Sequence, residues 1–181
     1  GVALGRGLSL AQLRRDYDAA FLGFGLAGVN GLGLDGEQLA GVVNAVDYIA
    51  TLRQAPNKAS LPVGRKVVVI GGGMTAIDIA VQSKALGAEE VTMVYRRGQE
   101  HMKASRYEQQ FAQTRGVNLR CWSTPRKLLG ADGRVCAIEF ETAQGQPYML
   151  DADVVFKAIG QKVLWDGLGD TAEVVEVKQG R

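Results

Sequence analysis

A glycine-rich turn that directly follows an apolar run is the part of this sequence best suited to bind a ligand. Residues 67–78 are VVVIGGGMTAID, which places G-x-G-x-x-A spacing on Gly71, Gly73 and Ala76. In a turn between a strand and a helix, Gly71 permits the tight bend, Gly73 lets the backbone approach a pyrophosphate, and Ala76 lets the helix lie close to the sheet. The free N–H groups at the helix N-terminus then face the anion. We therefore predict a dinucleotide site here, with a turn that serves packing alone as the alternative.

The segment after the next predicted strand distinguishes between nicotinamide dinucleotides. Folds that bind NAD usually place an Asp or Glu at the end of this strand, where it holds the ribose 2′-hydroxyl. Here residues 91–95 are followed by Arg96 and Arg97, with no acid at that end. Two guanidinium groups suit a 2′-phosphate through bidentate, charge-assisted hydrogen bonds, and Lys103 could add a third charge. The pattern favours NADPH over NADH, and a solvated basic loop is the alternative.

Side chains that could bind a metal or carry out nucleophilic catalysis are scarce. The sequence has one histidine, His101, and two isolated cysteines, Cys121 and Cys136. An iron–sulfur cluster or a structural zinc site needs about four such ligands, so neither is expected in this chain. No nucleophile–base arrangement is evident, and we name no catalytic residue. Hydride transfer between a nicotinamide and a flavin depends on positioning rather than on side-chain acid–base chemistry, so a redox role is compatible with this pattern.

Other conspicuous side chains have simpler interpretations. His101 belongs to no triad-like pattern and is expected on a loop surface. Trp122 and Phe140 fall at predicted strand positions, and we expect them in the core rather than in a platform that stacks on a ligand. Asp78 lies inside the predicted helix, where we expect it to bond locally rather than to act as a base.

The composition is ordinary for a soluble globular chain, and it excludes several classes of function. The 181 residues include 21 Lys or Arg and 19 Asp or Glu, which gives a formal charge of +2. Because no basic run could neutralise a phosphate backbone, we expect no nucleic-acid partner. The longest apolar run, residues 67–70, is far shorter than the roughly 20 residues that a membrane span needs. With two isolated cysteines and no visible signal peptide, a cytoplasmic location is expected.

The first third of the chain is expected to be part of a larger domain. The predicted elements are a helix from the Ser9–Gln12 capping box to about residue 16, a strand over 19–24, a loop over 25–36, and a helix over 45–52 that Asn44 could cap. One strand and two helices cannot bury both faces of a sheet, so residues 1–54 are interpreted as an incomplete domain. Residues 55–65, which include two prolines, are the predicted linker.

The next part of the chain alternates strands with helices and is expected to form a domain over residues 66–160. The predicted elements are strands over 66–70, 91–95 and 117–122, helices over 75–86 and 105–114, a hairpin over 126–129 and 135–142, and a last strand over 152–159. This alternation implies a parallel, doubly wound sheet with an inserted β-meander. The expected fold class is α/β with a Rossmann-like dinucleotide-binding domain.

These motifs resemble a known family. The signature over residues 69–78, the block over 94–98 and the KAIGQ segment over 157–161 are similar to the small (β) subunit family of NADPH-dependent glutamate synthase. That family includes the pyridine-nucleotide part of dihydropyrimidine dehydrogenase, which residues 96–104 resemble most. The resemblance covers about residues 8–165.

The resemblance implies roles for individual residues. Gly71, Gly72, Gly73, Met74 and Thr75 would hold the pyrophosphate, Arg96, Arg97 and Lys103 would hold the 2′-phosphate, and Ala158, Ile159 and Gly160 would lie near the nicotinamide and the flavin. Residues 18–25 resemble the strand that returns to the FAD-binding domain of the family. Residues 1–54 would then be part of that domain, and residues 161–181 would return toward it.

The resemblance also implies an electron path and leaves its end open. In such proteins electrons pass from NAD(P)H to FAD and then through iron–sulfur clusters to a distant site. FAD and the clusters would be bound in the full-length protein, and a second catalytic subunit or domain would carry the substrate site. The alternatives are the small subunit of glutamate synthase and a non-catalytic dinucleotide-binding module. This chain on its own is expected to be inactive.

Overall fold

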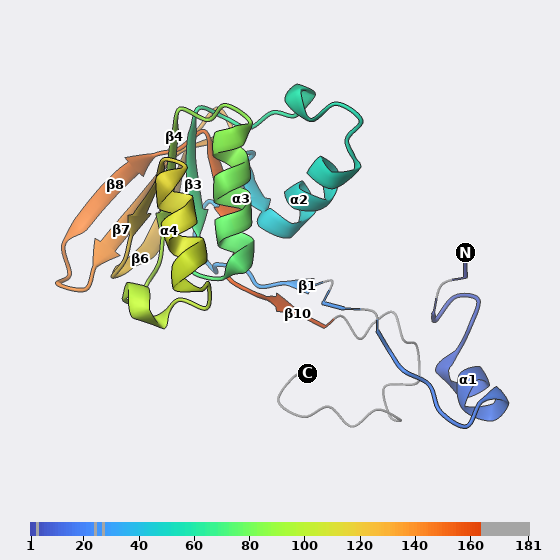
Figure 1. Ribbon diagram of the computed structural model, residues 1–181. Helices are drawn as coiled ribbons and strands as arrows, with labels where there is room; N and C mark the ends of the chain where they lie inside the picture. The colour runs from blue at the N-terminus through green and yellow to red at the C-terminus, as the bar shows by residue number, and fades with distance from the viewer. Residues whose placement is uncertain (3, 24, 27, 164–181) are drawn as a thin grey trace. The chain divides into compact units, whose positions relative to one another are not determined.

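The computed structural model divides the chain into two compact units, which are drawn in Figure 1. The described residues are 1–2, 4–23, 25–26 and 28–163. The first unit combines residues 1–30 with residues 161–181, and the second unit is the continuous stretch 31–160. The elements that form the candidate site belong to the second unit.

The second unit is built on a five-stranded sheet in which all paired strands are parallel. In spatial order the strands are β2 (Val42–Asn44), β9 (Val154–Lys157), β3 (Lys66–Ile70), β4 (Glu90–Val94) and β5 (Val117–Arg120). The helices of this unit are α2 (Ala45–Gln54), α3 (Met74–Ala85) and α4 (Arg106–Thr114), with short 3-10 helices η1 (Lys58–Ser60) and η2 (Gln99–His101). The predicted α/β class with a parallel sheet is confirmed.

Alternating side chains of the parallel sheet fill two separate cores. Val67 and Val69 pack with residues of α2, α3 and α4, whereas Val68 and Ile70 pack against a second sheet on the opposite face. Successive residues of a strand point to opposite sides, so the unbroken apolar run of β3 is buried on both faces. Figure 1 shows α3 and α4 in front of β3 and β4. None of the helices in the described part of the chain is both long enough and apolar enough to cross a membrane.

The second core is closed by a three-stranded antiparallel sheet, which confirms the predicted β-meander. Its strands are β6 (Ser123–Ala131), β7 (Arg134–Thr142) and β8 (Pro147–Asp151). The turn between β6 and β7 contains Asp132 and Gly133, whose φ angles are +50° and +75°, as a two-residue hairpin turn requires. Phe140 is completely buried, as expected, and stacks on Tyr148 with ring centroids 5.5 Å apart.

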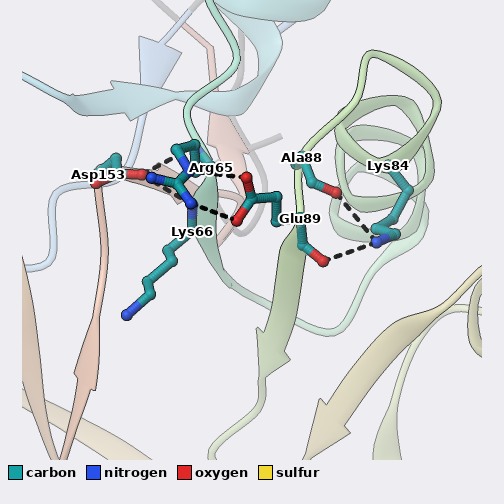
Figure 2. Close-up of polar contacts among 6 residues, drawn as sticks. All are labelled: Arg65, Lys66, Lys84, Ala88, Glu89 and Asp153. Atoms are coloured by element: carbon teal, nitrogen blue, oxygen red, sulfur yellow. Dashed lines mark hydrogen bonds and ion pairs between the residues drawn. The ribbon is translucent and has the colours of Figure 1, made fainter.

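Polar contacts anchor β9 beside β3 at the amino edge of the sheet (Figure 2). The Asp153 carboxylate accepts hydrogen bonds from the backbone N–H groups of Arg65 (2.8 Å) and Lys66 (2.9 Å). The bond from Lys66, with that from Arg65, lowers the pKa of Asp153 although partial burial opposes the shift. The Arg65 guanidinium forms two bonds to Glu89, at 2.8 and 2.9 Å, and Lys84 of α3 donates to the Glu89 carbonyl (3.0 Å). These contacts tie together β9, β3 and the turn that follows α3.

The first unit has short regular elements among its described residues. Helix α1 (Leu10–Asp16) begins at the predicted capping box, in which the Ser9 N–H donates to Gln12 Oε1 (2.8 Å) and the Gln12 N–H donates to Ser9 Oγ (3.1 Å). Strand β1 (Gly28–Val29) pairs antiparallel with β10 (Gln161–Lys162). The first unit is therefore joined from two segments that are far apart in sequence.

The predicted strand over residues 19–24 is not found. Residues 19–23 are not assigned to a strand, Phe21 is 96% exposed, and residue 24 lies outside the described residues. An extended segment forms a strand only where a neighbour accepts and donates its backbone hydrogen bonds. None of the described strands pairs with this segment.

The predicted domain boundary at residue 54 also differs from the observed one. The division falls between residues 30 and 31, because β2 pairs with β9 in the parallel sheet and α2 packs into the same core as α3. Residues 55–65 therefore connect α2 to β3 within one unit instead of linking two domains. Strand β2 is only three residues long, which is too short for a strand pattern to be recognised in the sequence.

Some element ends differ from the predicted ones. Strand β5 ends at Arg120 rather than at residue 122, because Trp122 has a φ of +54° and leaves the extended conformation. Strand β6 begins at Ser123, three residues before the predicted hairpin. Asn44 stands at the N-cap of α2, but its side-chain amide donates to Asp47 Oδ2 (2.9 Å) and does not cap a backbone N–H.

We expect Phe156→Ala to destabilise the second unit by about 3–5 kcal/mol, because it leaves a cavity in the core. Phe156 is 0% exposed on β9, and its ring lies 5.0 Å from the ring of Tyr48. The measurement is urea denaturation followed by circular dichroism. Met149→Ala, at a side chain that is 63% exposed on β8, is the matched control and should change the unfolding free energy by about 0.5 kcal/mol or less. Equal effects of the two substitutions would contradict the observed packing.

Candidate functional site

The predicted site residues converge on the carboxyl edge of the parallel sheet. Residues 71–75 follow β3, residues 95–98 follow β4, and residues 158–160 follow β9. Because these strands are parallel neighbours in the order β9-β3-β4, their carboxyl ends lie at one edge. From β3 the chain continues to β4, its neighbour on one side in the sheet, whereas the neighbour of β3 on the other side is β9, which comes much later in sequence. In open α/β sheets ligands bind in the crevice outside such a reversal of strand order.

Gly71 brings two strand ends into direct backbone contact. Its φ is +150°, and a Cβ at this position would overlap the carbonyl oxygen of Ala158. The Gly71 N–H donates to Val94 O (3.0 Å), and the Ala158 N–H donates to Ile70 O (2.9 Å). The turn after β3 is therefore fixed between the ends of β4 and β9, and only glycine fits there.

The next two glycines differ in the space around them. A Cβ on Gly72 would lie 2.6 Å from the Tyr95 ring, so this position too is filled by a neighbour. Gly73 has no atom within 4 Å of the position that a Cβ would take, and it forms the N-cap of α3 with ordinary extended angles. The surface beyond Gly73 is open, whereas the surface beyond Gly72 is not.

Backbone donors at the start of α3, next to the open surface at Gly73, have no hydrogen-bond partner in the described part of the chain. Among the described residues, the N–H groups of residues 72–75 form no hydrogen bond, and the first helical bonds come from Ala76 and Ile77 to Gly73 O (3.0 and 3.2 Å). Ala76 is completely buried, as its predicted role in close helix–sheet packing requires. Met74 is largely exposed and Thr75 is half-buried. A helix N-terminus with free N–H groups carries partial positive charge.

The predicted basic residues follow β4 and lie beside the glycine turn. Arg96, Arg97 and Lys103 are exposed, and none of them forms an ion pair with another described side chain. The Ala104 N–H donates to Gly72 O (3.2 Å), which holds the segment containing Lys103 against the turn. Three cations without an ion pair among the described side chains thus belong to the segment that follows β4, which contacts the glycine turn.

Ala158, Ile159 and Gly160 continue from β9 on the other side of the turn. Ala158 and Ile159 are half-buried, and each packs at the edge of one of the two cores. Gly160 is exposed and has a φ of +108°. The structure therefore brings the three predicted groups of site residues to one edge of the sheet, with residues 158–160 on one side of Gly71 and the cations on the other.

A half-buried ion pair next to this edge was not predicted. Lys157 Nζ lies 2.8 Å from Glu37 Oε1, and the two side chains are only 14% and 21% exposed. The Glu37 carboxylate also accepts the N–H groups of Leu32 (3.0 Å) and Gly33 (2.9 Å). Burial opposes ionisation of Glu37, but the bonds from Lys157 and the two backbone groups prevail and lower its pKa. The pair joins residues 120 positions apart, and no sequence pattern indicates it.

Trp122 was expected in the core, and this expectation is wrong. Its side chain is 50% exposed after the end of β5, next to the basic segment. Residues 121 and 122 lie beyond the last pairing of β4 with β5, so the alternating burial of the strand does not extend to them. His101 is exposed, as expected, and its Nδ1 lies 2.8 Å from Glu100 Oε1.

A groove of about 600 Å³ lies on the helical face of the sheet, close to the same turn. Residues of α2, α3 and α4 line it, including Met74 and Thr75 at the start of α3. Asp78 lies in this groove, accepts a hydrogen bond from Gln82 of its own helix and faces Arg53 at 3.5 Å. Its bond with Gln82 is local, as predicted, whereas its ion pair with Arg53 joins α3 to α2.

We expect the ion pair between Glu37 and Lys157 to make the stability of the second unit pH-dependent. Because the folded pKa of Glu37 is lowered, its contribution is complete above the ordinary pKa of about 4.3 and is lost as the pH falls through the lower folded value. Glu37→Gln should cost about 1.5–3 kcal/mol at pH 7, and this difference should shrink below pH ~4.

The measurement is urea denaturation of both proteins between pH 3 and pH 7. Glu141→Gln breaks the exposed pair with Arg126 (2.7 Å) and serves as the control, with an expected cost of about 0–1 kcal/mol. A Glu37→Gln difference that stays constant down to pH 3 would show that ionisation of Glu37 does not stabilise the fold.

Two known proteins with similar sequences are each longer than this chain. The small chain of glutamate synthase [NADPH] from Halomonas elongata is 37% identical over 155 residues, which are 81% of this chain and 33% of the relative. The subunit PreT of NAD-dependent dihydropyrimidine dehydrogenase from Salmonella typhimurium is 34% identical over 163 residues, 90% of this chain and 38% of that subunit. The chain thus spans about a third of the length of these relatives. They confirm the resemblance to the glutamate synthase small subunit family.

A solved structure and a family model also match this chain. The structure of FprA from Mycobacterium tuberculosis in complex with NADPH matches 90% of this chain and 54% of its own, with a TM-score of 0.73 and 18% identity. At that identity the match supports the fold, which is Rossmann-like as predicted. The model of the pyridine nucleotide-disulphide oxidoreductase family matches residues 10–181. The chain therefore belongs to the pyridine nucleotide-disulphide oxidoreductase family.

Proposed function

We propose that residues 31–160 bind a nicotinamide dinucleotide, with NADPH preferred over NADH, at the carboxyl edge of the parallel sheet. The observation that carries this proposal is the open surface at Gly73. There a diphosphate could approach the backbone without meeting a side chain, next to the free N–H groups of residues 72–75. A glycine turn that served packing alone would need no open face at this position.

The residues around the turn fit the remaining parts of the ligand. The backbone of Gly71, Gly72, Gly73, Met74 and Thr75 would hold the pyrophosphate, and Arg96, Arg97 and Lys103 would hold a 2′-phosphate. The absence of ion pairs for these three cations within the described residues leaves them available for an anion. Ala158, Ile159 and Gly160 would lie near the nicotinamide, on the side of Gly71 opposite to the cations.

We further propose that the bound nucleotide serves a redox enzyme larger than this chain. Bound there, NADPH supplies a hydride, and residues 158–160 would orient its nicotinamide toward an FAD. The first unit, residues 1–30 with 161–181, would be part of the FAD-binding domain. Iron–sulfur clusters and the substrate site would belong to other parts of the protein or to a second catalytic subunit.

Two assignments of the whole enzyme are supported by specific relatives. A role like that of dihydropyrimidine dehydrogenase is favoured by the PreT match, which covers 90% of this chain, and by the residues after β4. The small subunit of glutamate synthase is the second candidate, supported by 37% identity to the Halomonas relative. A non-catalytic dinucleotide-binding module is the third possibility. Assaying the full-length protein for NADPH-dependent reduction of a pyrimidine, and of 2-oxoglutarate with glutamine, separates the three.

We expect Gly73→Ala to abolish most nucleotide binding while preserving the fold. The added methyl group meets no atom within 4 Å, and alanine at a compatible backbone conformation is neutral or slightly stabilising. It would nevertheless keep the pyrophosphate from the backbone, so calorimetric affinity for both NADPH and NADH should fall at least about tenfold, or about 1.4 kcal/mol.

Gly71→Ala is the matched variant, and in contrast to Gly73→Ala it is expected to destabilise the fold. Its methyl group would overlap Ala158 O at a φ of +150°, so unfolding should become easier by about 1–3 kcal/mol. If Gly73→Ala binds both nucleotides as the unchanged protein does, the pyrophosphate is not held at this turn.

We expect the double substitution Arg96→Ala with Arg97→Ala to weaken NADPH binding selectively. Hydrogen bonds to a charged phosphate contribute about 1.5–3 kcal/mol each, whereas NADH lacks this phosphate. Titration calorimetry at low and high salt should show a preference for NADPH that the substitutions remove and that high salt reduces.

Lys127→Ala is the control, because Lys127 is an exposed cation of β6 away from this edge. It should change neither affinity. An equal loss for NADPH and NADH in the double variant would mean that the arginines do not contact the 2′-phosphate.

A further inference from the structure

Trp122 is an exposed aromatic side chain beside the proposed nucleotide site, and packing does not explain its position. It follows β5, the neighbour of β4, and half of its surface is exposed. The groove on the helical face does not include it, and it belongs to neither core cluster. A large aromatic side chain exposed beside a proposed binding site is a candidate contact for a flat ligand.

The backbone of Trp122 adopts a conformation that a bulky residue disfavours. Trp122 and Asp132 are the non-glycine residues with positive φ in the described part of the chain. The angle at Asp132 follows from its place in the Asp132–Gly133 hairpin turn. No comparable turn accounts for the +54° at Trp122. An unfavourable conformation that the surrounding structure maintains is a reason to look for a function.

Backbone hydrogen bonds hold Trp122 in this conformation and join it to the basic segment. The Trp122 N–H donates to Arg97 O (3.1 Å), and the Ala143 N–H donates to Trp122 O (3.0 Å). The flanking Ser123 N–H donates to Tyr95 O (3.2 Å). The bonds to Arg97 and Tyr95 continue the contact with the segment after β4 beyond the end of the β4–β5 ladder, and the bond from Ala143 joins Trp122 to the residue after β7. The backbone of Trp122 is therefore held next to that of Arg97.

No parallel ring covers the indole among the described residues. Its aromatic neighbour is His101, with ring centroids 6.4 Å apart and ring planes at 72°. The two rings are edge to face rather than parallel. Because Trp122 is 50% exposed, part of its surface is available for contact with a ligand ring.

The covalent order of the ligand matches the spatial order of the strand ends. In NADPH the pyrophosphate, the ribose with its 2′-phosphate and the adenine follow one another. The proposed pyrophosphate site follows β3, the proposed 2′-phosphate site follows β4, and Trp122 follows β5. Because adenine is attached to the ribose that bears the 2′-phosphate, it must lie close to the arginines.

We propose that Trp122 stacks on the adenine ring of the dinucleotide and so contributes binding energy that does not depend on the 2′-phosphate. This inference rests on the proposed function and names the residue that contacts the adenosine end. Trp122 takes no part in hydride transfer. Its contribution is the same for phosphorylated and unphosphorylated adenosine, unlike that of the arginines.

The test compares Trp122→Asn with the unchanged chain by calorimetric titration of NADPH and of 2′,5′-ADP, which is the adenosine half alone. Asparagine tolerates positive φ and removes the aromatic surface, so the variant should fold with an unfolding temperature no lower than that of the parent. The expected result is a loss of affinity of about 5- to 150-fold, equal for both ligands, as for one lost base–aromatic stack.

Two further variants serve as controls. Trp122→Tyr should retain most of the affinity. Phe21→Asn, which removes an exposed aromatic ring of the first unit, should retain all of it.

A second readout separates stacking from an indirect effect on Arg97. Trp122→Asn should leave the preference for 2′,5′-ADP over 5′-AMP unchanged, whereas Arg97→Ala should reduce it. The other tryptophan of the sequence is Trp165. In a Trp165→Phe background, 2′,5′-ADP should therefore quench the fluorescence of Trp122 directly.

The outcomes distinguish this inference from the proposed function. If Trp122→Asn binds both ligands within twofold of the parent, or loses the 2′-phosphate preference as Arg97→Ala does, the stacking role is overturned while the nucleotide site stands. If the unchanged chain binds neither NADPH nor 2′,5′-ADP, the proposed function is overturned and the stacking role with it.

Discussion

The direct contact of two backbones at Gly71 and Ala158 is the constraint on which the rest of the site depends. With no side chain between them, β3 and β9 remain hydrogen-bonded neighbours up to their carboxyl ends. The segments that leave these ends must then diverge, one into the glycine turn and α3, the other into residues 159–160. This divergence creates the open surface in front of Gly73. A single methyl group at Gly71 would overlap the carbonyl oxygen of Ala158 and force the two strand ends apart.

Charged groups fix both ends of β9, which lies between β2 and β3 and is the last strand of the parallel sheet in sequence. At its amino end, Asp153 accepts two backbone N–H groups from the start of β3. At its carboxyl end, Lys157 is paired with Glu37, whose carboxylate also orders the segment before β2. Between these ends the strand contributes apolar side chains to both cores. The apolar residues thus hold the strand in the sheet, and the carboxylates of Asp153 and Glu37 attach its two ends to the start of β3 and to the segment before β2.

Sequence patterns were sufficient wherever a local rule determined the structure. The strand before Gly71, the turn, the helix after it and the Asp132–Gly133 hairpin each follow from residue types within a few positions, and each was found. The features that the sequence did not reveal depend on distant partners. Glu37 and Lys157 meet across 120 positions, and the three residues of β2 become a strand only because β9 lies beside them. Conversely, residues 19–23 have the composition of a strand and lack a described partner.

Trp122 illustrates a different limit. Alternating burial predicts the orientation of a side chain only while the strand continues, and β5 ends two residues earlier. Beyond that point the backbone torsion decides the orientation, and an aromatic residue with positive φ has no sequence signature. For this reason the strand pattern predicts a core position for Trp122, which is exposed in the structure. The glycine turn, by contrast, combines a sequence pattern with the backbone geometry that the pattern requires.

The pairing of β1 with β10 makes the stretch between them a topological insertion. Gly28 lies opposite Lys162 and Val29 opposite Gln161, so the points where the chain enters and leaves this stretch are one strand spacing apart, roughly 4.8 Å. A link of a few residues could close that gap. Residues 31–160 therefore form an inserted unit whose two ends lie close together. Another domain with the same distance between its ends could replace this unit without breaking the pairing of β1 with β10.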